Sequence, residues 1–267
     1  MERPLAQLSL CPRTEHLEGS FGGTKPDMRS LTEVGGLVAR FEQYEAENRV
    51  EQWERLNVLV QEKLDGLGVS IFFKEQHQPV LNYRPSPHPA DKEEDEADFR
   101  DFQEWVYAHE EDLFRVLGSD RSFVLHGQWL AGRQRGVHYS RLPSPFVAVD
   151  LMEAAMAHRF LAYDLMVEVL GSVVPAAPVL WRSRPAAPYA QPIATTPGAH
   201  FNGLQQRIKL PQALTQTSAF GDEPVEGLYL RIERGGETTH HRYKLMRQTE
   251  RPDDRRRGPK TNVVVAS

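Results

Sequence analysis

The sequence has 267 residues, of which 40% are hydrophobic, and a net charge of −5. This length predicts one large domain with extensions, and the acidic balance argues against a surface coated with basic groups for nonspecific nucleic-acid binding. The single cysteine, Cys11, excludes an internal disulfide framework and a cysteine-rich zinc site. The charged start of the chain makes a poor signal peptide, and no apolar run is long enough for a transmembrane helix. We therefore expect a cytoplasmic protein without membrane contact.

Hydrophobic periodicity predicts both helices and strands, which follow one another in this order: a helix over 31–53, strands over 56–63, 67–73 and 79–84, a helix over 99–117, strands over 123–132 and 146–152, a helix over 159–171, an extended segment over 172–181, and strands over 225–232 and 239–247. The Pro-rich, acidic stretch 85–98 predicts a solvated loop. The order of elements predicts an α+β fold with antiparallel sheets flanked by helices. We divide the chain into a flexible N-terminal arm (1–28), one domain (29–250) and a disordered charged tail (251–267).

Lys63 stands at the end of the strand 56–63, just before the predicted Asp65-Gly66 turn. The period of two places Lys63 on one face of this strand and Glu62 on the other. The residues alone leave two interpretations open. Lys63 is either an exposed lysine beside a hairpin turn or a nucleophile held at the end of an apolar strand. A lysine with a pKa near 10 is protonated and inert, so a nucleophile needs burial, neighbouring cations or a metal to lower its pKa.

Six short blocks stand in the order and near the spacing of motifs I, Ia, III, IIIa, IV and V of the covalent nucleotidyltransferases: EKLDG (62–66), LNYR (81–84), HGQWLAG (126–132), FVAVDLM (146–152), EGLYLR (226–231) and RYKLMR (242–247). On these blocks, the chain from about Leu31 to Arg247 resembles the superfamily of polynucleotide ligases and capping enzymes. Within that superfamily it is most similar to the RNA ligase 2-like family. The resemblance implies a nucleotidyltransferase (ATP-grasp-like) domain.

The same resemblance implies an activity. ATP and Mg²⁺ (or Mn²⁺) would serve as cofactors, Lys63 would form a lysyl-AMP intermediate, and the AMP would pass to an RNA 5′-phosphate. A 3′-hydroxyl would then seal the RNA, as in RNA repair. Arg84 resembles the arginine of the family's motif Ia, which is expected near the ribose or the leaving phosphates. Leu67 stands where many DNA ligases have an arginine after Asp-Gly, and this difference favours RNA.

The resemblance assigns roles to individual residues. Lys63, Lys244 and Arg242 would be catalytic, with the two cations of one strand face reaching the α-phosphate. Glu226 would bind the metal. A further set of residues would contact the nucleotide, and Lys244 belongs to this set as well. These residues are Glu62, Asp65, Gly66, Arg84, Gln128, Phe146, Val149 and Lys244. Each basic or acidic residue also has a simpler interpretation as an exposed strand residue, and a basic edge strand discourages aggregation.

Two positions depart from the family pattern. Gln128 stands where motif III usually has glutamate, and it brings no negative charge toward a metal. Val149 precedes Asp150 where motif IIIa usually carries an aromatic residue that stacks on the base, and Phe146 is an alternative stacking residue. These departures keep open a nucleotide- or RNA-binding protein with little turnover. A guanylyltransferase of capping type is a further alternative, because no residue decides the base.

The expected partners are RNA ends, in a nicked duplex or a broken structured RNA. The sequence continues for about twenty residues beyond motif V, which leaves little room for the second domain that many ligases use to engage nucleic acid. We therefore expect the arm, a compact groove or a partner protein to take that role.

Overall fold

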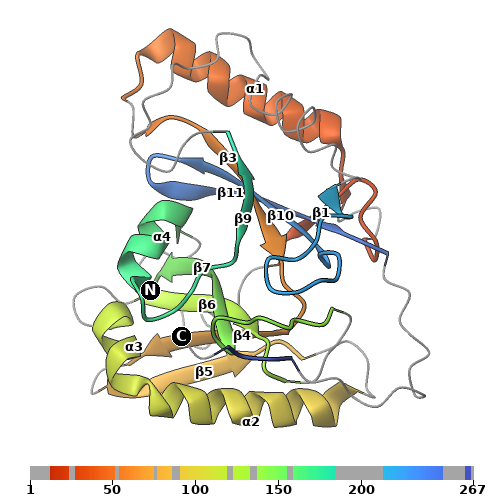
Figure 1. Ribbon diagram of the computed structural model, residues 1–267. Helices are drawn as coiled ribbons and strands as arrows, with labels where there is room; N and C mark the ends of the chain where they lie inside the picture. Colours follow the sequence, from red (N-terminus) through yellow and green to blue (C-terminus); the bar gives the residue numbers. More distant parts are fainter. Residues whose placement is uncertain are drawn as a thin grey trace.

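The structure is a computed structural model, and it describes residues 13–23, 28–51, 54–74, 77–85, 91–118, 123–132, 137–154, 159–183, 213–248 and 262–265. The strands are β1 (Glu15–Leu17), β2 (Met28–Arg29), β3 (Asn57–Lys63), β4 (Leu67–Phe73), β5 (Pro79–Tyr83), β6 (Phe123–Trp129), β7 (Phe146–Glu153), β8 (Phe160–Leu161), β9 (Val179–Arg182), β10 (Gly227–Arg234) and β11 (Glu237–Met246). The helices are α1 (Leu31–Asn48), α2 (Lys92–Ala108), α3 (Glu110–Leu117) and α4 (Tyr163–Leu170). This mixture confirms the predicted α+β class (Figure 1).

Hydrogen bonds connect the strands in the order β5-β4-β6-β7-β8-β11-β10-β3-β9, with every neighbouring pair antiparallel. The connection between the two halves of this path is β8, which has only two residues. Its Phe160 pairs with Met152 of β7 on one side and with Thr238 of β11 on the other. The expected antiparallel sheets are therefore two layers of a single hydrogen-bonded sheet, and the short strand β8 joins the layers (Figure 1).

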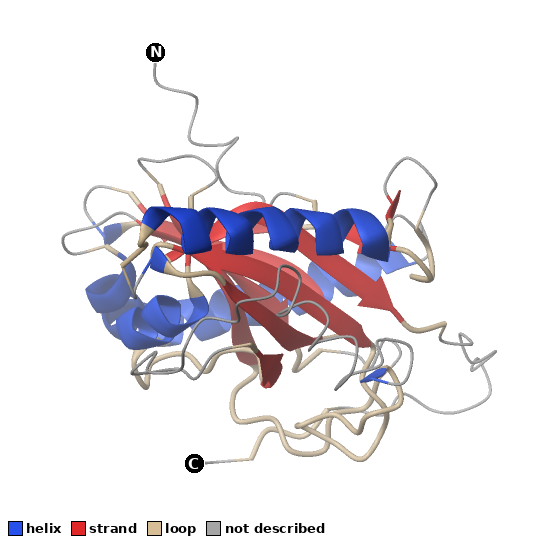
Figure 2. Ribbon diagram, turned by 90° about the horizontal axis from the view of Figure 1, so that it is seen from above, coloured by secondary structure: helices blue, strands red, loops and turns tan. Residues whose placement is uncertain are grey.

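Helix α1 covers the outer face of the layer built from β9, β3, β10 and β11 (Figure 2). Its buried Val34 and Val38 pack in one cluster with Val58 and Val60 of β3 and with Leu228 of β10. The helix begins at Ser30, whose hydroxyl accepts the Glu33 amide in a capping box. Burial of this apolar stripe fixes the face of β3 that carries Val58 and Val60 toward α1.

Helices α2 and α3 cover the outer face of the second layer, built from β5, β4, β6 and β7 (Figure 1). Phe102 of α2 and Leu113 of α3 are fully buried against Ile71 of β4 and Leu125 of β6. With both outer faces covered by helices, the inner faces of the two layers are turned toward each other. Among the described helices, none is both long and apolar enough to cross a membrane.

The inner faces carry the polar residues of strands that are otherwise apolar. Side chains alternate on β3 as predicted, yet Gln61 and its apolar neighbours are all buried, because the second layer covers the face opposite α1. Arg231 of β10 and Asp150 of β7 are both fully buried between the layers. Buried charges need partners, so this interior supports a network of ion pairs and hydrogen bonds rather than a purely apolar core.

Three element predictions need correction. Helix α1 ends at Asn48 rather than near residue 53. Arg49, the next residue, adopts a left-handed conformation (φ 45°) that ends the helix. The segment 85–98, predicted as a loop, contains the first turns of α2 from Lys92. Acidic residues stabilise a helix N-terminus through the helix dipole, so the acidic run begins the helix. The predicted helix 159–171 divides into β8 and α4. Of the segment 85–98, residues 86–90 lie outside the described part of the chain.

Parts of the predicted arm and tail are paired with the domain. Strand β1 pairs in parallel with β11 and buries Leu17 in the α1 cluster, because the edge of β11 offers backbone groups that another strand can satisfy. Residues 262–265 hydrogen-bond to 139–142. These described parts of the arm and the tail are therefore attached to the domain. Residues 1–12, 24–27, 249–261 and 266–267 lie outside the described residues, and the domain boundaries stay a prediction.

Candidate functional site

Lys63 lies where β3 ends, in contact with a carboxylate from the neighbouring strand. Its Cα is paired with Gly227 of β10, which places it beside Glu226, the residue before that strand. The Lys63 Nζ donates to Glu226 Oε2, and the two side chains are 25% and 12% exposed. The lysine is thus half-buried and paired, which does not fit the simpler interpretation as a freely solvated surface residue.

Burial and neighbouring charges act on the pKa of Glu226 in opposite directions, and their net effect raises this pKa to about 7. Burial is the largest cause, because a low dielectric disfavours the charged carboxylate. Lys63 lowers the pKa of Glu226, Asp65 raises it, and Lys244 lowers it by a smaller amount. Two lysines and two carboxylates therefore lie within electrostatic range of one another. They come from β3, from β11, from the residue before β10 and from the turn after β3.

The Asp65-Gly66 turn does not form the hairpin that the sequence predicts. Strand β3 pairs with β10 and β9, while β4 pairs with β5 and β6, so the chain passes from one layer to the other between Lys63 and Leu67. A Cβ added at Gly66 would lie 2.5 Å from the Trp129 carbonyl oxygen, which explains the glycine. The nucleophile candidate therefore stands at the junction between the layers.

A segment without helix or strand structure holds this turn on its other side. The Val137 amide donates to Asp65 Oδ2 at 3.0 Å, and the Asp65 amide donates to the Tyr139 hydroxyl at 2.7 Å. Tyr139 is fully buried. Burial raises the pKa of its phenol well above the ordinary value, the Asp65 hydrogen bond lowers it, and the charges of Asp65, Glu226 and Glu62 raise it further. Tyr139 thus lies among the carboxylates of the site, and sequence reasoning missed it.

Lys244 of β11 and Arg84, which follows β5, complete the cationic side of the site. Burial lowers the pKa of Lys244, and the nearby charges of Lys63 and Arg84 lower it further. The Arg84 amide donates to the Gly68 carbonyl at 2.8 Å, which fixes the backbone of Arg84 beside β4. These cations come from β3, β11 and the end of β5, so the two layers converge on one positively charged region.

Arg242 does not share that region with Lys244, although both lie on the same face of β11 as expected. Its Nη1 donates to Asp150 Oδ2 at 2.8 Å, and its guanidinium lies 3.8 Å from the centre of the Phe160 ring. Its side chain is 6% exposed. A buried ion pair with a carboxylate of the other layer holds Arg242 in place, and a shared phosphate contact of Arg242 and Lys244 stays a prediction.

Asp150 is the centre of that buried network. Besides Arg242, it accepts the Tyr229 hydroxyl at 2.8 Å, and its Oδ1 lies 3.4 Å from Arg231 Nη1. Burial raises the pKa of Asp150, but the charges of Arg242 and Arg231 and the Tyr229 hydrogen bond outweigh burial and hold it below its usual value. The sequence signal for this network was a charged residue inside each of two apolar strands, FVAVDLM and EGLYLRI.

His126 of β6 lies beside the same network. Its Nδ1 is 2.7 Å from the Ser70 hydroxyl of β4. Burial lowers the pKa of His126 to about 4, Asp150 raises it, and Arg242 and Arg84 lower it. His126 is therefore neutral near pH 7, and it adds no charge to the region between the layers.

The remaining nucleotide-binding predictions have different outcomes. Gln128 pairs across from Gly68, and a Cβ added at Gly68 would lie 3.8 Å from Gln128 Nε2 and 4.0 Å from Arg84 Cβ. Phe146 is fully buried, with its ring 5.7 Å from that of Phe102 in the outer core, so it cannot stack on a base from there. Val149 is partly buried against the cluster that contains Leu64 and Tyr139.

Glu62 faces away from Lys63, as the strand period predicted. Its Oε2 accepts the Ala219 amide at 2.9 Å. Its Oε1 is buried and has no hydrogen-bond partner among the described residues. Burial raises the pKa of Glu62, and hydrogen bonds from Ser218 and Ala219 lower it. The buried, unpartnered oxygen is an acceptor that a ligand donor could satisfy.

The carboxylates of the site fit a hard divalent cation rather than a transition-metal cage. The described residues contain no group of three or more His, Cys, Asp or Glu side chains that could hold a metal ion. Mg²⁺ keeps several waters and is usually bound through one or two carboxylates together with substrate phosphates. Glu226, with Asp65 in electrostatic range, offers such a donor set.

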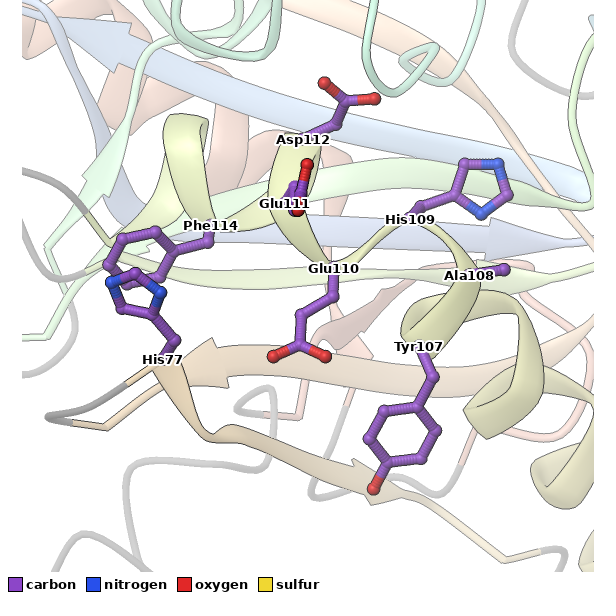
Figure 3. Close-up of a pocket in the computed structure, with 8 residues that line it drawn as sticks. All are labelled: His77, Tyr107, Ala108, His109, Glu110, Glu111, Asp112 and Phe114. Carbon is purple, nitrogen blue, oxygen red and sulfur yellow. The ribbon is translucent and has the colours of Figure 1, made fainter.

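A cavity of about 520 Å³ lies elsewhere, at the junction of α2 and α3 (Figure 3). It is lined by His77, Tyr107, Ala108, His109, Glu110, Glu111, Asp112 and Phe114. The rings of His77 and Phe114 lie 3.7 Å apart at its edge. None of the residues predicted for the site lines this cavity, so we do not assign it to the same function.

Comparison with solved structures finds an RNA ligase from Naegleria gruberi. A variant solved with ATP and Mn is 13% identical, with a TM-score of 0.44 over 87% of this chain and 58% of that one. A second variant with ATP and Mn is 14% identical, with a TM-score of 0.43 over 92% and 62%. A third, with AMP and Mn, is 13% identical, with a TM-score of 0.38 over 74% and 52%. The chain thus spans about three fifths of the length of the first two structures.

A search of the curated proteins finds no match. A family model gives a direct assignment. The model described as RNA ligase matches residues 56–246, which is more than half of the chain and includes β3, β10 and β11 with the Lys63 site. This chain therefore belongs to the RNA ligase family.

Proposed function

We propose that the chain is an ATP-dependent RNA ligase that works through a covalent lysyl-AMP intermediate at Lys63. The observation that carries the proposal is the position of Lys63, which is half-buried at the end of β3, in contact with Glu226 and within electrostatic range of Lys244. A surface lysine has no need of such surroundings. A phosphoryl-transfer nucleophile needs burial, a proton acceptor and nearby cations for the phosphates.

In the proposed first step, the Lys63 Nζ loses its proton and attacks the α-phosphorus of ATP. A nitrogen–phosphorus bond forms, the bond to the β-phosphate oxygen breaks, and pyrophosphate leaves. Glu226 Oε2 is in contact with Nζ and can accept its proton. Lys244 and Arg84 neutralise the charge that develops on the phosphates.

The next two steps transfer AMP and join the RNA. An oxygen of an RNA 5′-phosphate attacks the phosphorus of the lysyl-AMP, and the lysine nitrogen leaves and regains a proton. A 3′-hydroxyl then attacks the activated 5′-phosphate and releases AMP. The substrates would be RNA ends in a nicked duplex or a broken structured RNA, as in RNA repair.

Mg²⁺ or Mn²⁺ fits the oxygen donors of the site, with Glu226 as the residue that would hold it. When bound, such an ion polarises the phosphate oxygens and neutralises the leaving pyrophosphate. Gln128 and Arg84, on either side of Gly68, would contact the nucleotide, and their closeness to one another supports this assignment. Asp65 and Gly66 set the backbone after the nucleophile. Arg242 and Phe146 have no direct part in this proposal, since each is committed to other contacts.

A nucleotide- or RNA-binding protein with little turnover is the second candidate. Two observations favour it: Gln128 supplies no charge for a metal, and Val149 supplies no aromatic face for a base. The paired Lys63 and Glu226 favour the ligase, because binding alone does not need a nucleophile. A capping-type guanylyltransferase would use the same lysine with GTP.

Intact-protein mass spectrometry decides among these three functions. The chain is treated with pyrophosphate, to remove any AMP already attached, and is then incubated with Mg²⁺ and either ATP or GTP. We expect the mass of one AMP to be added to the wild type and to Lys92→Ala, whose lysine lies on the surface of α2 with its side chain 72% exposed. We expect no addition to Lys63→Ala.

The other outcomes are equally informative. Label that persists in Lys63→Ala would move the nucleophile to another lysine. A GMP adduct would favour the capping-type function. Nucleotide binding without an adduct, with either nucleotide or with Mn²⁺ in place of Mg²⁺, would favour the binding protein.

A further inference from the structure

Residues 262–265, here called the strap, pair with residues 139–142, in the segment that contacts the Asp65-Gly66 turn. The Val263 amide donates to the Tyr139 carbonyl, the Leu142 amide to the Val263 carbonyl, and the Val265 amide to the Leu142 carbonyl, each at 2.9 Å. Leu142 and Val264 form a parallel bridge. The strap thus adds a short strand to a segment that has no other regular secondary structure.

The side chain of Asn262 extends this pairing into the interior. Its Oδ1 accepts the Tyr139 amide at 2.8 Å, and its Nδ2 donates to the Leu130 carbonyl at 2.7 Å. Asn262 is 7% exposed, whereas the three valines that follow are 42–49% exposed. The valines are only partly covered, so the hydrogen bonds of the strap and of the Asn262 side chain contribute to holding it in place alongside the apolar contacts.

Asn262 joins Tyr139 and Leu130, which are two of the residues that contact the turn after Lys63. Tyr139 accepts the Asp65 amide through its hydroxyl. Leu130 lies against Gly66, where an added Cβ would be 2.7 Å from Leu130 Cδ2. One buried amide side chain therefore ties together two of the residues that contact the turn.

The turn depends on these neighbours because it has no hairpin of its own. Strands β3 and β4 belong to different layers, so no hydrogen bonds between them fix the position of Asp65. The segment 137–139 is held in several ways: Val137 and Tyr139 are buried in one cluster with Leu64 and Leu130, the His138 amide donates to Glu223 Oε2 at 3.0 Å, and the Tyr139 ring packs against Phe220. The strap supplies the partners of the Tyr139 backbone amide and backbone carbonyl.

We propose that Asn262, with the strap, is a positioning residue for nucleotide transfer: it holds Tyr139 and Leu130 against the Asp65-Gly66 turn and thereby fixes Lys63. It touches no reacting atom. The inference rests on the proposed function for its catalytic consequence. Its structural part concerns only the order of the turn. A displacement of about 1 Å at a nucleophile lowers a rate by roughly a hundred-fold, so a modest loosening of the turn is enough to affect transfer.

The first experiment compares Asn262→Ala with a matched control, Asn57→Ala. Asn57 is also a buried asparagine with two side-chain hydrogen bonds, to Glu233 and Ser183, but it stands at the opposite end of β3 from Lys63. Single-turnover labelling with ATP is measured over a range of ATP concentrations. We expect Asn262→Ala to lower the rate constant at saturating ATP about ten-fold or more. The half-saturating ATP concentration should stay nearly unchanged, and Asn57→Ala should label at close to the wild-type rate.

The second experiment measures hydrogen exchange of the Asp65 and Val137 amides, which needs no activity. We expect Asn262→Ala to speed the exchange of both amides about ten-fold, because a buried hydrogen-bond network that loses one member opens more readily. Asn57→Ala should leave both amides protected. If the wild type takes no label, the proposed function fails, and the exchange result alone decides the role of the strap.

A second pair of variants covers the case in which Asn262→Ala does not fold. Val263→Pro removes the amide that donates to Tyr139, whereas Val263→Ala keeps that amide and shortens an exposed side chain. We expect slowed labelling and faster Asp65 exchange in the proline variant only. Unchanged Asp65 exchange in Asn262→Ala, or in Val263→Pro when that variant replaces it, would overturn the proposal. So would a change of the same size in Val263→Ala.

Discussion

Arg242 and Lys244 stand two residues apart on one face of β11, yet the structure predicts opposite consequences for their removal. Arg242→Ala should destabilise the fold and Lys244→Ala should not, while Lys244→Ala should impair AMP transfer in a folded protein. The reason is that Arg242 neutralises the fully buried Asp150, whereas Lys244 lies among other cations. Removal of Lys244 relieves repulsion with Lys63 and Arg84 and leaves Glu226 in contact with Lys63, whereas removal of Arg242 leaves a buried charge with fewer partners.

The size of the effect follows from the partners that Asp150 retains. Removing one member of a buried ion pair costs about 3–5 kcal/mol. In Arg242→Ala, Asp150 keeps the Tyr229 hydrogen bond at 2.8 Å and Arg231 at 3.4 Å, so we expect the low end, a loss of about 3 kcal/mol. Loss of the contact between the Arg242 guanidinium and the Phe160 ring acts in the same direction.

The assay is urea unfolding of the wild type and both variants at pH 7, with AMP labelling alongside. The pKa of Asp150 is lowered in the folded protein, so the stability it contributes is present above about pH 4 and is lost as the pH falls through the folded-state pKa. The difference between the wild type and Arg242→Ala should therefore narrow in acid. A loss below about 1 kcal/mol in Arg242→Ala, or an equal loss in Lys244→Ala, would refute the reasoning.

Three further predictions concern the inner faces and the turn. Burial lowers the pKa of His126 to about 4, so between pH 6.5 and 4 the unfolded chain binds a proton that the folded chain does not. From pH 7 to pH 5, the free energy of unfolding of the wild type should then fall by about 2 kcal/mol relative to that of His126→Gln. Urea unfolding that gives the same difference between the two proteins at both pH values would contradict this. Gly66→Ala should slow labelling roughly a hundred-fold, because its Cβ would meet the Trp129 carbonyl oxygen at 2.5 Å, whereas Gly36→Ala, with open space around its Cβ, should label normally; equal rates would show that the turn tolerates the shift. Gln128→Glu should lower the Mg²⁺ concentration needed for half-maximal labelling, since a carboxylate adds a charged oxygen donor, and an unchanged Mg²⁺ titration would place residue 128 away from the ion.

Much of the fold could be predicted from the sequence, because local pattern decides local structure. Alternation of apolar residues in LNVLVQEK predicted β3 and the opposite faces of Glu62 and Lys63, and the structure confirms both. The order of strands and helices predicted the α+β class. The blocks around Lys63 and Glu226 indicated the RNA ligase family, which the family match confirms. The catalytic roles of these residues stay predictions until labelling is measured.

The tertiary structure decided what a period of two leaves open, namely what covers each face of a strand. Arg242 and Lys244 have the same parity, but only the position of β7 shows that Asp150 pairs with the first of them. Phe146 carries a ring near motif IIIa, and its burial against Phe102 follows from where α2 packs.

Contacts between distant parts of the chain were equally out of reach of the sequence. The Asp-Gly pair has the local chemistry of a hairpin turn, but β3 and β4 join different layers because β10 and β6 offer each of them a better partner than the other. The burial of Asn262 beside Tyr139 depends on a contact across 123 positions. The sequence by itself determined the strands and the family resemblance from which the site residues are predicted. Only the packing of two layers and one strap decided which of them meet, because partners so far apart along the chain leave no local pattern.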